Sequence, residues 1–492
     1  MRLGKRQDLV RRQVARDEVV LTKVCACVHK LRHSSWFSCY LTMATWNMFY
    51  SCFFVFIIYS LAEGKGTKYI PPVVLIPGCG GSQLEAKIDT PASVRVVCNS
   101  RTNEWFTMWL NIDLIIPSYI DCFVAHMKLE YDNVTRTTRN AAGVETRIPG
   151  FGNSSTVEWL NPGDVYLLGY FNNLVSGILP LGYERGVTLR GAPYDFRKAP
   201  NELGEYFLNL RDLIESTRVE TGHKVVLVAH SMGAPLVHYF LNYQPQSWKD
   251  QYIETLVTLS GAWAGSVKAV HIYATGDNLG IPFLKASKAR IEQVTLPSLS
   301  FLLPSSQVWG PEEVLIQTKQ RNYSTGNFKE LFENLKLPDA YDMYLDTKNL
   351  LHLSTAPGVE IHCIHGEGVA TVEKLVYDDD NFPNNPQVVT GAGDGSVNAR
   401  STRFCLNFAK KQEQKIYHHV LNKVDHMGVL YNSESITYLT NLLANISRKN
   451  EQHALMMKNL IQAEKGKEKQ FVWKYPGMEE ADEIKVRAGL IK

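Results

Sequence analysis

The sequence predicts an α/β fold in which a mostly parallel sheet is flanked by helices. Short apolar segments rich in β-branched residues alternate with longer segments whose apolar residues recur at helical spacing. This alternation favours right-handed crossovers between parallel strands. The 492 residues are 45% hydrophobic and 21% charged. Such a chain can bury a large core, which excludes wholesale disorder and a small disulfide-bonded scaffold.

The predicted strands and helices begin at residue 71. Residues 224–229 (KVVLVA) read as a buried strand, and residues 202–218 place Tyr206, Leu210 and Leu213 on one helical face. The same criteria predict strands at 71–77, 253–260 and 359–364 and a helix at about 233–241. Together these elements predict one large α/β domain over residues 63–446.

Two long stretches within that domain fit the alternation poorly. We interpret residues 90–165 and 265–355 as insertions above the sheet. After residue 446 the composition changes, because residues 447–492 carry 17 charges in 46 positions. We expect this charged tail to be a peripheral helix or a disordered appendage.

The N-terminus has the pattern of a targeting segment. Residues 34–62 contain no Asp, Glu, Lys or Arg, and residues 48–61 are densely apolar. A basic region, an apolar region and small residues before about Ala62 predict a secretory signal, with an uncleaved signal anchor as the alternative. Residues 1–32 carry a net charge of +6, so residues 33–492 carry −3 of the total of +3. A slightly acidic body does not favour nucleic-acid binding.

The body carries further marks of the secretory pathway. Five cysteines follow residue 62, and an odd number in an oxidising compartment leaves at least one thiol unpaired or intermolecular. No cysteine or histidine cluster has zinc spacing, and we expect neither a metal nor another cofactor. Four sequons indicate surface glycosylation, at Asn133, Asn153, Asn322 and Asn445.

The segment Ala229-His-Ser231-Met232-Gly233 stands between a predicted strand and a predicted helix. A sharp turn in this context exposes a nucleophilic serine and aims the next backbone N–H at a developing oxyanion. An ordinary β–α turn is the alternative. We expect Ser231 to be the nucleophile and Met232 to supply one oxyanion donor.

The glycine-rich segment 77–82 (PGCGGS) follows the first predicted strand. Glycines allow a tight turn that presents backbone N–H groups, and we expect that of Cys79 to be the second oxyanion donor. A phosphate-binding loop is the alternative, but no Gly-Lys-Ser/Thr ending follows and the glycine spacing differs from G-x-G-x-x-G.

A serine nucleophile needs a base and an orienting acid, which in this arrangement follow it in the order Asp/Glu, then His. Asp394 stands in a glycine-rich loop (GAGDGS), whereas the acidic run 378–380 reads as a solvated turn. His426 stands in a loop before a predicted helix, whereas residues 418 and 419 are histidines within a predicted strand (KIYHHVL). We therefore expect Asp394 and His426 to complete a triad.

Residues 70–444 resemble the lecithin:cholesterol acyltransferase family. The matching segments are long: PGCGGSQLEAKIDTP, WFTMWLNIDLIIPSYIDC, PGFGNSSTVEWL, GAPYDFR, VVLVAHSMG, YQPQSWKDQYI and ATGDNLGIP. The resemblance implies an α/β-hydrolase core with a cap domain and a small membrane-binding domain. It implies the same roles for the five residues Ser231, Asp394, His426, Cys79 and Met232.

The resemblance also implies two disulfides, Cys98–Cys122 and Cys363–Cys405, which leave Cys79 as the free thiol. It implies a serine-dependent phospholipase A and O-acyltransferase that passes an acyl group to water or to a lipid alcohol, a sterol or an N-acylsphingosine. Features of a cholesterol-esterifying branch and of a lysosomal phospholipase branch are mixed, so the acceptor stays open. The segment 260–264 (SGAWA) departs from the usual pattern but keeps the lid-side tryptophan, Trp263.

An apolar stripe in residues 98–122 suits contact with a phospholipid membrane or a lipoprotein surface. It contains Trp105, Phe106, Trp109 and Leu110. Core packing is the alternative for this stripe. Two other function classes remain open on the sequence alone, namely another secreted serine esterase and a non-catalytic lipid-binding protein on a hydrolase fold.

Overall fold

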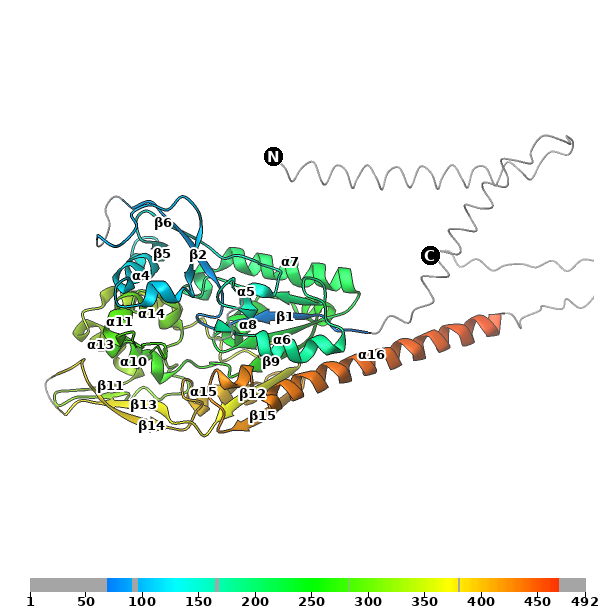
Figure 1. Cartoon of the computed structure of the whole chain (residues 1–492). Coiled ribbons are helices and arrows are strands. Elements are labelled where there is room, and N and C mark those ends of the chain that lie inside the picture. Colours follow the sequence, from blue (N-terminus) through cyan, green and yellow to red (C-terminus); the bar gives the residue numbers. More distant parts are fainter. Residues whose placement is uncertain (1–68, 91–95, 164–167, 282, 379–380, 469–492) are drawn as a thin grey trace, which may run out of the picture. The chain divides into compact units, whose positions relative to one another are not determined.

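Six parallel strands form the central sheet of the protein (Figure 1). The computed structural model describes residues 69–90, 96–163, 168–281, 283–378 and 381–468. The strand order is β15-β12-β9-β8-β1-β7, and every neighbouring pair is parallel. The strands are β1 (Val73–Ile76), β7 (Leu189–Gly191), β8 (Val225–His230), β9 (Ile253–Leu259), β12 (Ile361–Glu367) and β15 (Ile416–Asn422). The predicted α/β fold with a mostly parallel sheet is confirmed.

The strands found by apolar runs are those buried on both faces. Every residue of β1 and of β8 is buried, and such strands read as continuous apolar segments. Strand β7 was not predicted. It is only three residues long and lies at the sheet edge with the half-buried Arg190 in its middle. A short edge strand of this kind leaves no apolar run to detect.

Helices cover both faces of this sheet. On one side α7, α8 and α9 pack together through Phe207, Phe240 and Trp248, and on the other side α6 packs against α16. Figure 1 shows α7 and α16 on opposite sides of the sheet. These helices are α6 (Asn172–Ile178), α7 (Gly204–Thr221), α8 (Gly233–Asn242), α9 (Gln246–Tyr252) and α16 (Ser433–Glu468).

The stretch 90–165 builds small antiparallel sheets and short helices. Strand β2, which precedes it, pairs with both β3 and β6, and β4 pairs with β5. The elements are β2 (Leu84–Ile88), β3 (Phe106–Trp109), α3 (Ile112–Ile115), α4 (Ile120–Met127), β4 (Leu129–Asp132), β5 (Thr137–Asn140), β6 (Val144–Arg147) and α5 (Ser155–Glu158).

The stretch 265–355 is mainly helical, and its short strands join a four-stranded sheet in the order β11-β10-β13-β14. The elements are α10 (Val267–Thr275), α11 (Ala286–Gln293), α12 (Pro297–Phe301), β10 (Ile316–Gln317), β11 (Asn322–Tyr323), α13 (Phe328–Asn334) and α14 (Pro338–Thr347), followed later by β13 (Thr371–Val376), β14 (Gln387–Gly391) and α15 (Ala399–Thr402). Helix α11 also packs against α4, so the two inserted stretches contact each other.

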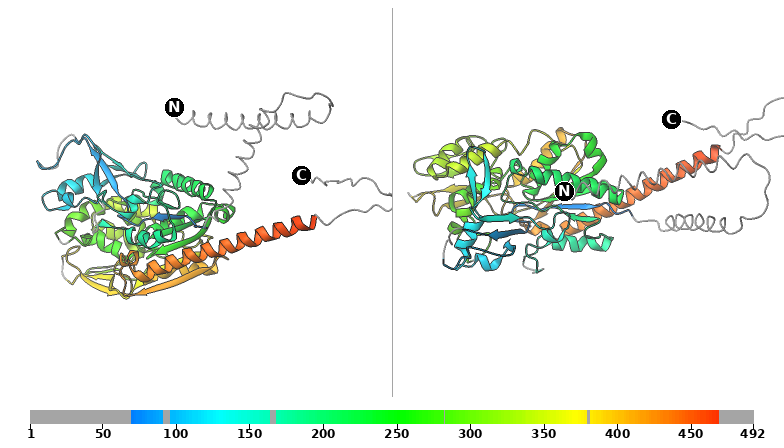
Figure 2. Two further views of the ribbon diagram at one scale, coloured as in Figure 1. Left: turned by 45° about the vertical axis from the view of Figure 1, so that its right-hand side comes forward. Right: turned by 90° about the horizontal axis from the view of Figure 1, so that it is seen from above.

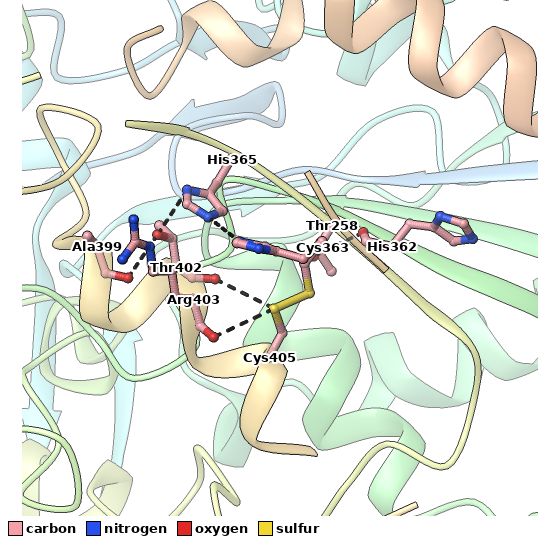
Figure 3. Close-up of a disulfide and its surroundings, with 9 residues drawn as sticks. Thr258, His362, Cys363, His365, Ala399, Thr402, Arg403 and Cys405 are labelled. Atoms are coloured by element: carbon pink, nitrogen blue, oxygen red, sulfur yellow. Dashed lines mark hydrogen bonds between the residues drawn. A yellow bond between two sulfur atoms is a disulfide. The ribbon is translucent and has the colours of Figure 1, made fainter. Parts of the chain in front are cut away.

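Two disulfides lie within the described residues. One joins Cys98 to Cys122, and the other joins Cys363 on β12 to Cys405 in the 3-10 segment Arg403–Lys410. Figure 3 shows the second disulfide with His365 beside it. The fifth cysteine of the body, Cys79, carries a free thiol.

The charged tail does not begin at a structural boundary. Helix α16 runs unbroken from Ser433 to Glu468, so the boundary predicted at residue 446 falls inside a helix. Its first half packs through buried Leu439 and Leu443, whereas residues 451–462 are all exposed. Figure 2 shows this second half extending away from the sheet in both views. Residues 469–492 lie outside the described part of the chain.

The predicted leader and signal, residues 1–62, also lies outside the described residues. Among the residues that are described, no helix is long and apolar enough to cross a membrane.

Candidate active site

Ser231 occupies a sharp turn between β8 and α8. Its φ of 55° is a left-handed conformation that is rare for a residue with a side chain, and its N–H is held by the carbonyl oxygen of Leu259 at 3.0 Å. Gly233 is required two residues later, because a Cβ there would lie 2.6 Å from the carbonyl oxygen of Pro77. The loop that follows β1 passes so close to this turn that only glycine fits at position 233.

The three residues predicted as a triad lie within hydrogen-bonding distance of one another. His426 Nε2 is 2.9 Å from Ser231 Oγ, and His426 Nδ1 is 2.8 Å from Asp394 Oδ2. A carboxylate only accepts, so Nδ1 carries the proton, and Nε2 is left to accept the serine proton. This is the tautomer in which His426 can act as a general base.

Asp394 is fully buried and held in its ionised form. Its Oδ1 accepts the backbone N–H groups of Ser396 and Val397 at 3.0 and 2.7 Å. Burial by itself would raise the pKa of Asp394, but the facing His426 and these N–H donors outweigh it and leave the pKa below its ordinary value. A buried carboxylate that stays ionised can orient an imidazole and stabilise its charged form.

Two backbone N–H groups stand free beside Ser231. In the part of the chain that the structure describes, the N–H of Cys79 and that of Met232 have no hydrogen-bond partner. Gly78 brings the loop of Cys79 against the nucleophile, since a Cβ at Gly78 would lie 2.6 Å from the Cβ of Ser231. The arrangement leaves both predicted oxyanion donors available to a bound substrate.

A buried pair that sequence reasoning missed supports this site from behind. Tyr170 Oη accepts the N–H of Gly78 at 2.9 Å and lies 2.5 Å from His230 Nδ1, while His230 Nε2 lies 3.0 Å from the carbonyl oxygen of His426. Burial lowers the pKa of His230 to about 3, so the ring is neutral. Because a carbonyl only accepts, Nε2–H donates to His426 and Nδ1 accepts from the tyrosine hydroxyl.

This hydrogen-bond chain joins the loop of Cys79 to the backbone of the base. No sequence signal pointed to Tyr170, which lies in a loop 60 residues before His230. His230 was part of the recognised segment, but its side chain was given no role.

An apolar pocket opens beside Ser231 and His426. Its walls come from the first inserted stretch, from the loop before α7 and from the second inserted stretch. The apolar lining includes Trp109, Met127, Phe196, Ile272, Leu279, Leu296, Leu299 and Leu302. The thiol of Cys79 also faces it.

The predicted exposure of Trp109 and Leu110 is wrong. Trp109 is 8% exposed and Leu110 is 9% exposed. The indole Nε1 of Trp109 donates to the carbonyl oxygen of Gly80 at 2.7 Å, and its ring packs against Phe123 and Phe196. These contacts place Trp109 in the wall of the pocket.

Trp105 and Phe106 are half-buried, and the guanidinium of Arg147 lies 4.5 Å above the Trp105 ring. The exposed apolar side chains of this stretch include Ile112 and Tyr119. Only part of the predicted stripe is therefore accessible.

Trp263, expected on the lid side of the site, is fully buried against His238 and Phe408 and does not line the cavity. The two histidines of KIYHHVL lie on β15 and bond elsewhere, His418 to His365 and His419 to Glu434.

The four sequon asparagines are all exposed, at Asn133, Asn153, Asn322 and Asn445. Within the described ranges no group of three or more His, Cys, Asp or Glu side chains is arranged to hold a metal ion.

Known proteins are similar to this chain over most of its length. The chain is 41% identical over 374 residues to the lysosomal phospholipase A and acyltransferase of Bos taurus, covering 76% of this chain and 91% of that protein. It is 39% identical over 377 residues to the phosphatidylcholine-sterol acyltransferase of Gallus gallus, covering 76% and 91%. Among solved structures, the Tle4–Tli4 complex contains a chain that aligns with a TM-score of 0.46 at 13% identity, covering 77% of this chain and 98% of that one.

The family match itself spans residues 105–350 and 344–458. A match of this extent, together with relatives aligned over nine-tenths of their own length, shows that the chain belongs to the lecithin:cholesterol acyltransferase family.

Proposed function

We propose that this protein is a phospholipid acyl hydrolase and O-acyltransferase that forms an acyl-enzyme on Ser231. The observation that carries the proposal is the chain from Ser231 through His426 to Asp394, with contacts of 2.9 and 2.8 Å, at the mouth of an apolar pocket. The relatives named for phospholipase A and acyltransferase activity support the same reaction class.

The reaction begins when Ser231 attacks an ester carbonyl of a glycerophospholipid while His426 takes the hydroxyl proton. Asp394 holds the imidazole and stabilises its charged form. The N–H groups of Cys79 and Met232 stabilise the oxyanion, a contribution of roughly 3–4 kcal/mol for each donor in comparable sites. His426 then returns the proton to the leaving oxygen, and a lysophospholipid departs.

The acyl group of the acyl-enzyme then passes to an acceptor. His426 again takes a proton, from water or from the hydroxyl of a lipid alcohol, as that oxygen attacks the acyl carbonyl. Water gives a free fatty acid, whereas a sterol or an N-acylsphingosine gives an acylated lipid. One group of relatives is named for acyl transfer to a sterol and the other for phospholipase A and acyltransferase activity, which supports both water and a lipid alcohol as acceptors.

Substrate would be drawn from a phospholipid membrane or a lipoprotein surface. The side chains that remain suited to surface contact are the half-buried Trp105 and Phe106 and the exposed Ile112 and Tyr119. All four belong to one inserted stretch, which also supplies Trp109 to the pocket wall. A lipid held at this surface would therefore lie next to the entrance of the site.

We further propose that the protein works in the secretory pathway, either secreted or lysosomal, with the N-terminal apolar segment as signal or anchor. Exposed sequons and two disulfides support this compartment. The proposed sugar acceptors are Asn133, Asn153, Asn322 and Asn445.

Product analysis tests the proposal directly. Purified protein is incubated with vesicles of phosphatidylcholine labelled in one acyl chain, alone or with a sterol or N-acylsphingosine. Wild type should release labelled fatty acid or acylated acceptor, and Ser231→Ala should release neither. A wild-type protein that yields no lysophospholipid under any of these conditions would overturn the proposal.

A further inference from the structure

The pocket beside Ser231 contains one acidic side chain that the proposed reaction does not use. Glu292, on α11, is 4% exposed and faces the cavity. Its Oε2 atom is buried and has no hydrogen-bond partner among the described residues. An unpaired buried carboxyl group is costly, so its presence in an otherwise apolar wall requires a reason.

A second polar atom without an oxygen or nitrogen partner lies in the same wall. Ser298, on α12, is 1% exposed and lines the pocket, and among the described residues the thiol of Cys79, a weak hydrogen-bonding group, is the one polar neighbour of its Oγ. Its hydroxyl faces the thiol of Cys79, and Glu292 acts electrostatically on the same thiol. Glu292 and Ser298 therefore lie close to the loop that offers an oxyanion donor.

Other polar groups of the lining satisfy one another. Lys268 pairs with Asp277 at 2.8 Å, and Gln293 both donates to and accepts from the backbone of Asp277. Ser266 donates to the carbonyl oxygen of Ser396. By contrast, Glu292 Oε2 has no hydrogen-bond partner among the described residues, and the Ser298 hydroxyl has only the weakly bonding Cys79 thiol beside it.

Among the described residues, no cationic side chain forms an ion pair with Glu292. Arg197 acts on it from a distance, but the Arg197 guanidinium is already paired with Asp195 at 2.7 Å. Burial raises the pKa of Glu292 to about 8, so at neutral pH the group is a carboxylic acid that can donate one hydrogen bond and accept others.

We propose that Glu292 and Ser298 form a polar subsite that selects acyl chains bearing a hydroxyl group close to the ester carbonyl. The inference rests on the proposed acyl-enzyme chemistry at Ser231. A plain hydrocarbon chain fills the apolar walls but leaves Glu292 without a partner and Ser298 with only the Cys79 thiol. A chain hydroxylated at its second or third carbon brings an oxygen to the part of the pocket next to Cys79, where it can accept from Glu292 and exchange a hydrogen bond with Ser298.

A substrate with a hydroxyl group gives these buried polar groups a hydrogen-bond partner, whereas a substrate without one does not. The enzyme should therefore react faster with the hydroxylated chain. Two hydrogen bonds of ordinary net strength correspond to a preference of about tenfold in kcat/KM. A hydroxyl at the far end of the chain cannot reach the subsite and should lose this advantage.

The test compares phosphatidylcholines that differ only in one chain: palmitoyl, palmitoyl hydroxylated at the second or third carbon, and palmitoyl hydroxylated at the terminal carbon. The variants are Glu292→Leu with Ser298→Ala, and the conservative Glu292→Gln. Ile291→Ala serves as the matched control, because Ile291 is 50% exposed on the same helix. Ratios between variants on identical vesicles cancel differences in how each lipid packs.

Wild type, Glu292→Gln and Ile291→Ala should prefer the chain hydroxylated near the carbonyl by about tenfold. The Glu292→Leu/Ser298→Ala protein should lose this preference and gain relative activity on the plain chain. Equal substrate ratios in wild type and the double variant, with hydrolysis intact, would overturn the subsite alone. Absence of hydrolysis of every lipid by wild type would overturn the proposed function with it.

Discussion

The ring nitrogen Nε2 of His230 lies 3.0 Å from the backbone carbonyl oxygen of His426. The residue directly before the nucleophile therefore holds the main chain of the base. Through Tyr170 the same chain of hydrogen bonds reaches the N–H of Gly78, one residue before the expected oxyanion donor Cys79. Nucleophile, base and oxyanion loop are thus fixed relative to one another by two buried side chains that do not line the pocket.

Removing one link should lower turnover more than binding. We expect Tyr170→Phe to reduce kcat on a soluble ester by about tenfold or more with little change in KM, because a buried hydrogen bond left unpaired costs about 1–3 kcal/mol. The measurement is steady-state turnover of p-nitrophenyl butyrate. Tyr183→Phe, which removes another buried tyrosine hydroxyl bonded to Pro71, is the control for general destabilisation. Equal losses in both variants would argue against a positioning role.

Cys79 should react slowly with maleimide at neutral pH. Burial raises the pKa of its thiol to about 12, and only the thiolate is nucleophilic. Because the thiol faces the pocket, an adduct should block the site by its bulk, and inactivation should accelerate about tenfold per pH unit. The measurement is the rate of inactivation at several pH values. Cys79→Gly should stay active and resist the reagent, since the backbone supplies the expected hydrogen bond. Complete labelling of the wild-type thiol without loss of activity would place that thiol away from the acyl group.

Surface contact should depend on the accessible part of the inserted stretch. Trp105→Ser with Ile112→Ser should lower liposome binding and turnover on vesicles together, since apolar insertion is worth about 25 cal/mol per Å². Soluble-ester turnover should be preserved. Val219→Ser, which removes an 80% exposed side chain on α7, is the matched control. Trp109→Ser should instead reduce turnover on both substrates, and a loss confined to vesicles in that variant would contradict its place in the pocket wall.

The stability of the protein should fall as the pH rises, through Glu292. Burial raises the pKa of this carboxyl from 4.5 in the unfolded chain to about 8 in the fold. Between these values the folded state keeps a proton that the unfolded state releases, so unfolding becomes easier with increasing pH by up to about 1.4 kcal/mol per pH unit. Glu292→Gln should remove this slope. Urea unfolding at pH 5 and pH 7.5 measures it, and parallel pH profiles for wild type and variant would disprove the shift.

The sequence predicts the role of a residue when that role depends on its neighbours along the chain. Strand β8 and the turn at Ser231 were predicted because an apolar run, a turn and a helix follow one another directly within residues 225–242. Asp394 and His426 were found because chain order and glycine-rich surroundings restrict the choice among candidates.

Other features depend on distant contacts that no local pattern contains. Trp109 reads as part of an exposed stripe, but the carbonyl of Gly80 and the ring of Phe196 bury it. Glu292 stands in a polar segment (KARIEQ) for which the sequence predicted no element, and only the packing of α11 over the pocket buries its carboxyl.

Covalent labelling tests the central claim most directly. A fluorophosphonate probe reacts only with a serine whose hydroxyl is activated by a neighbouring base, so its site of attachment reports the working geometry. Treated wild-type protein should carry one adduct, mapped by peptide mass spectrometry to Ser231, and should lose phospholipid turnover in proportion to labelling, while His426→Ala should label at least a hundredfold more slowly. An unmodified Ser231 in fully inactivated protein, or full turnover by protein labelled at Ser231, would contradict the account.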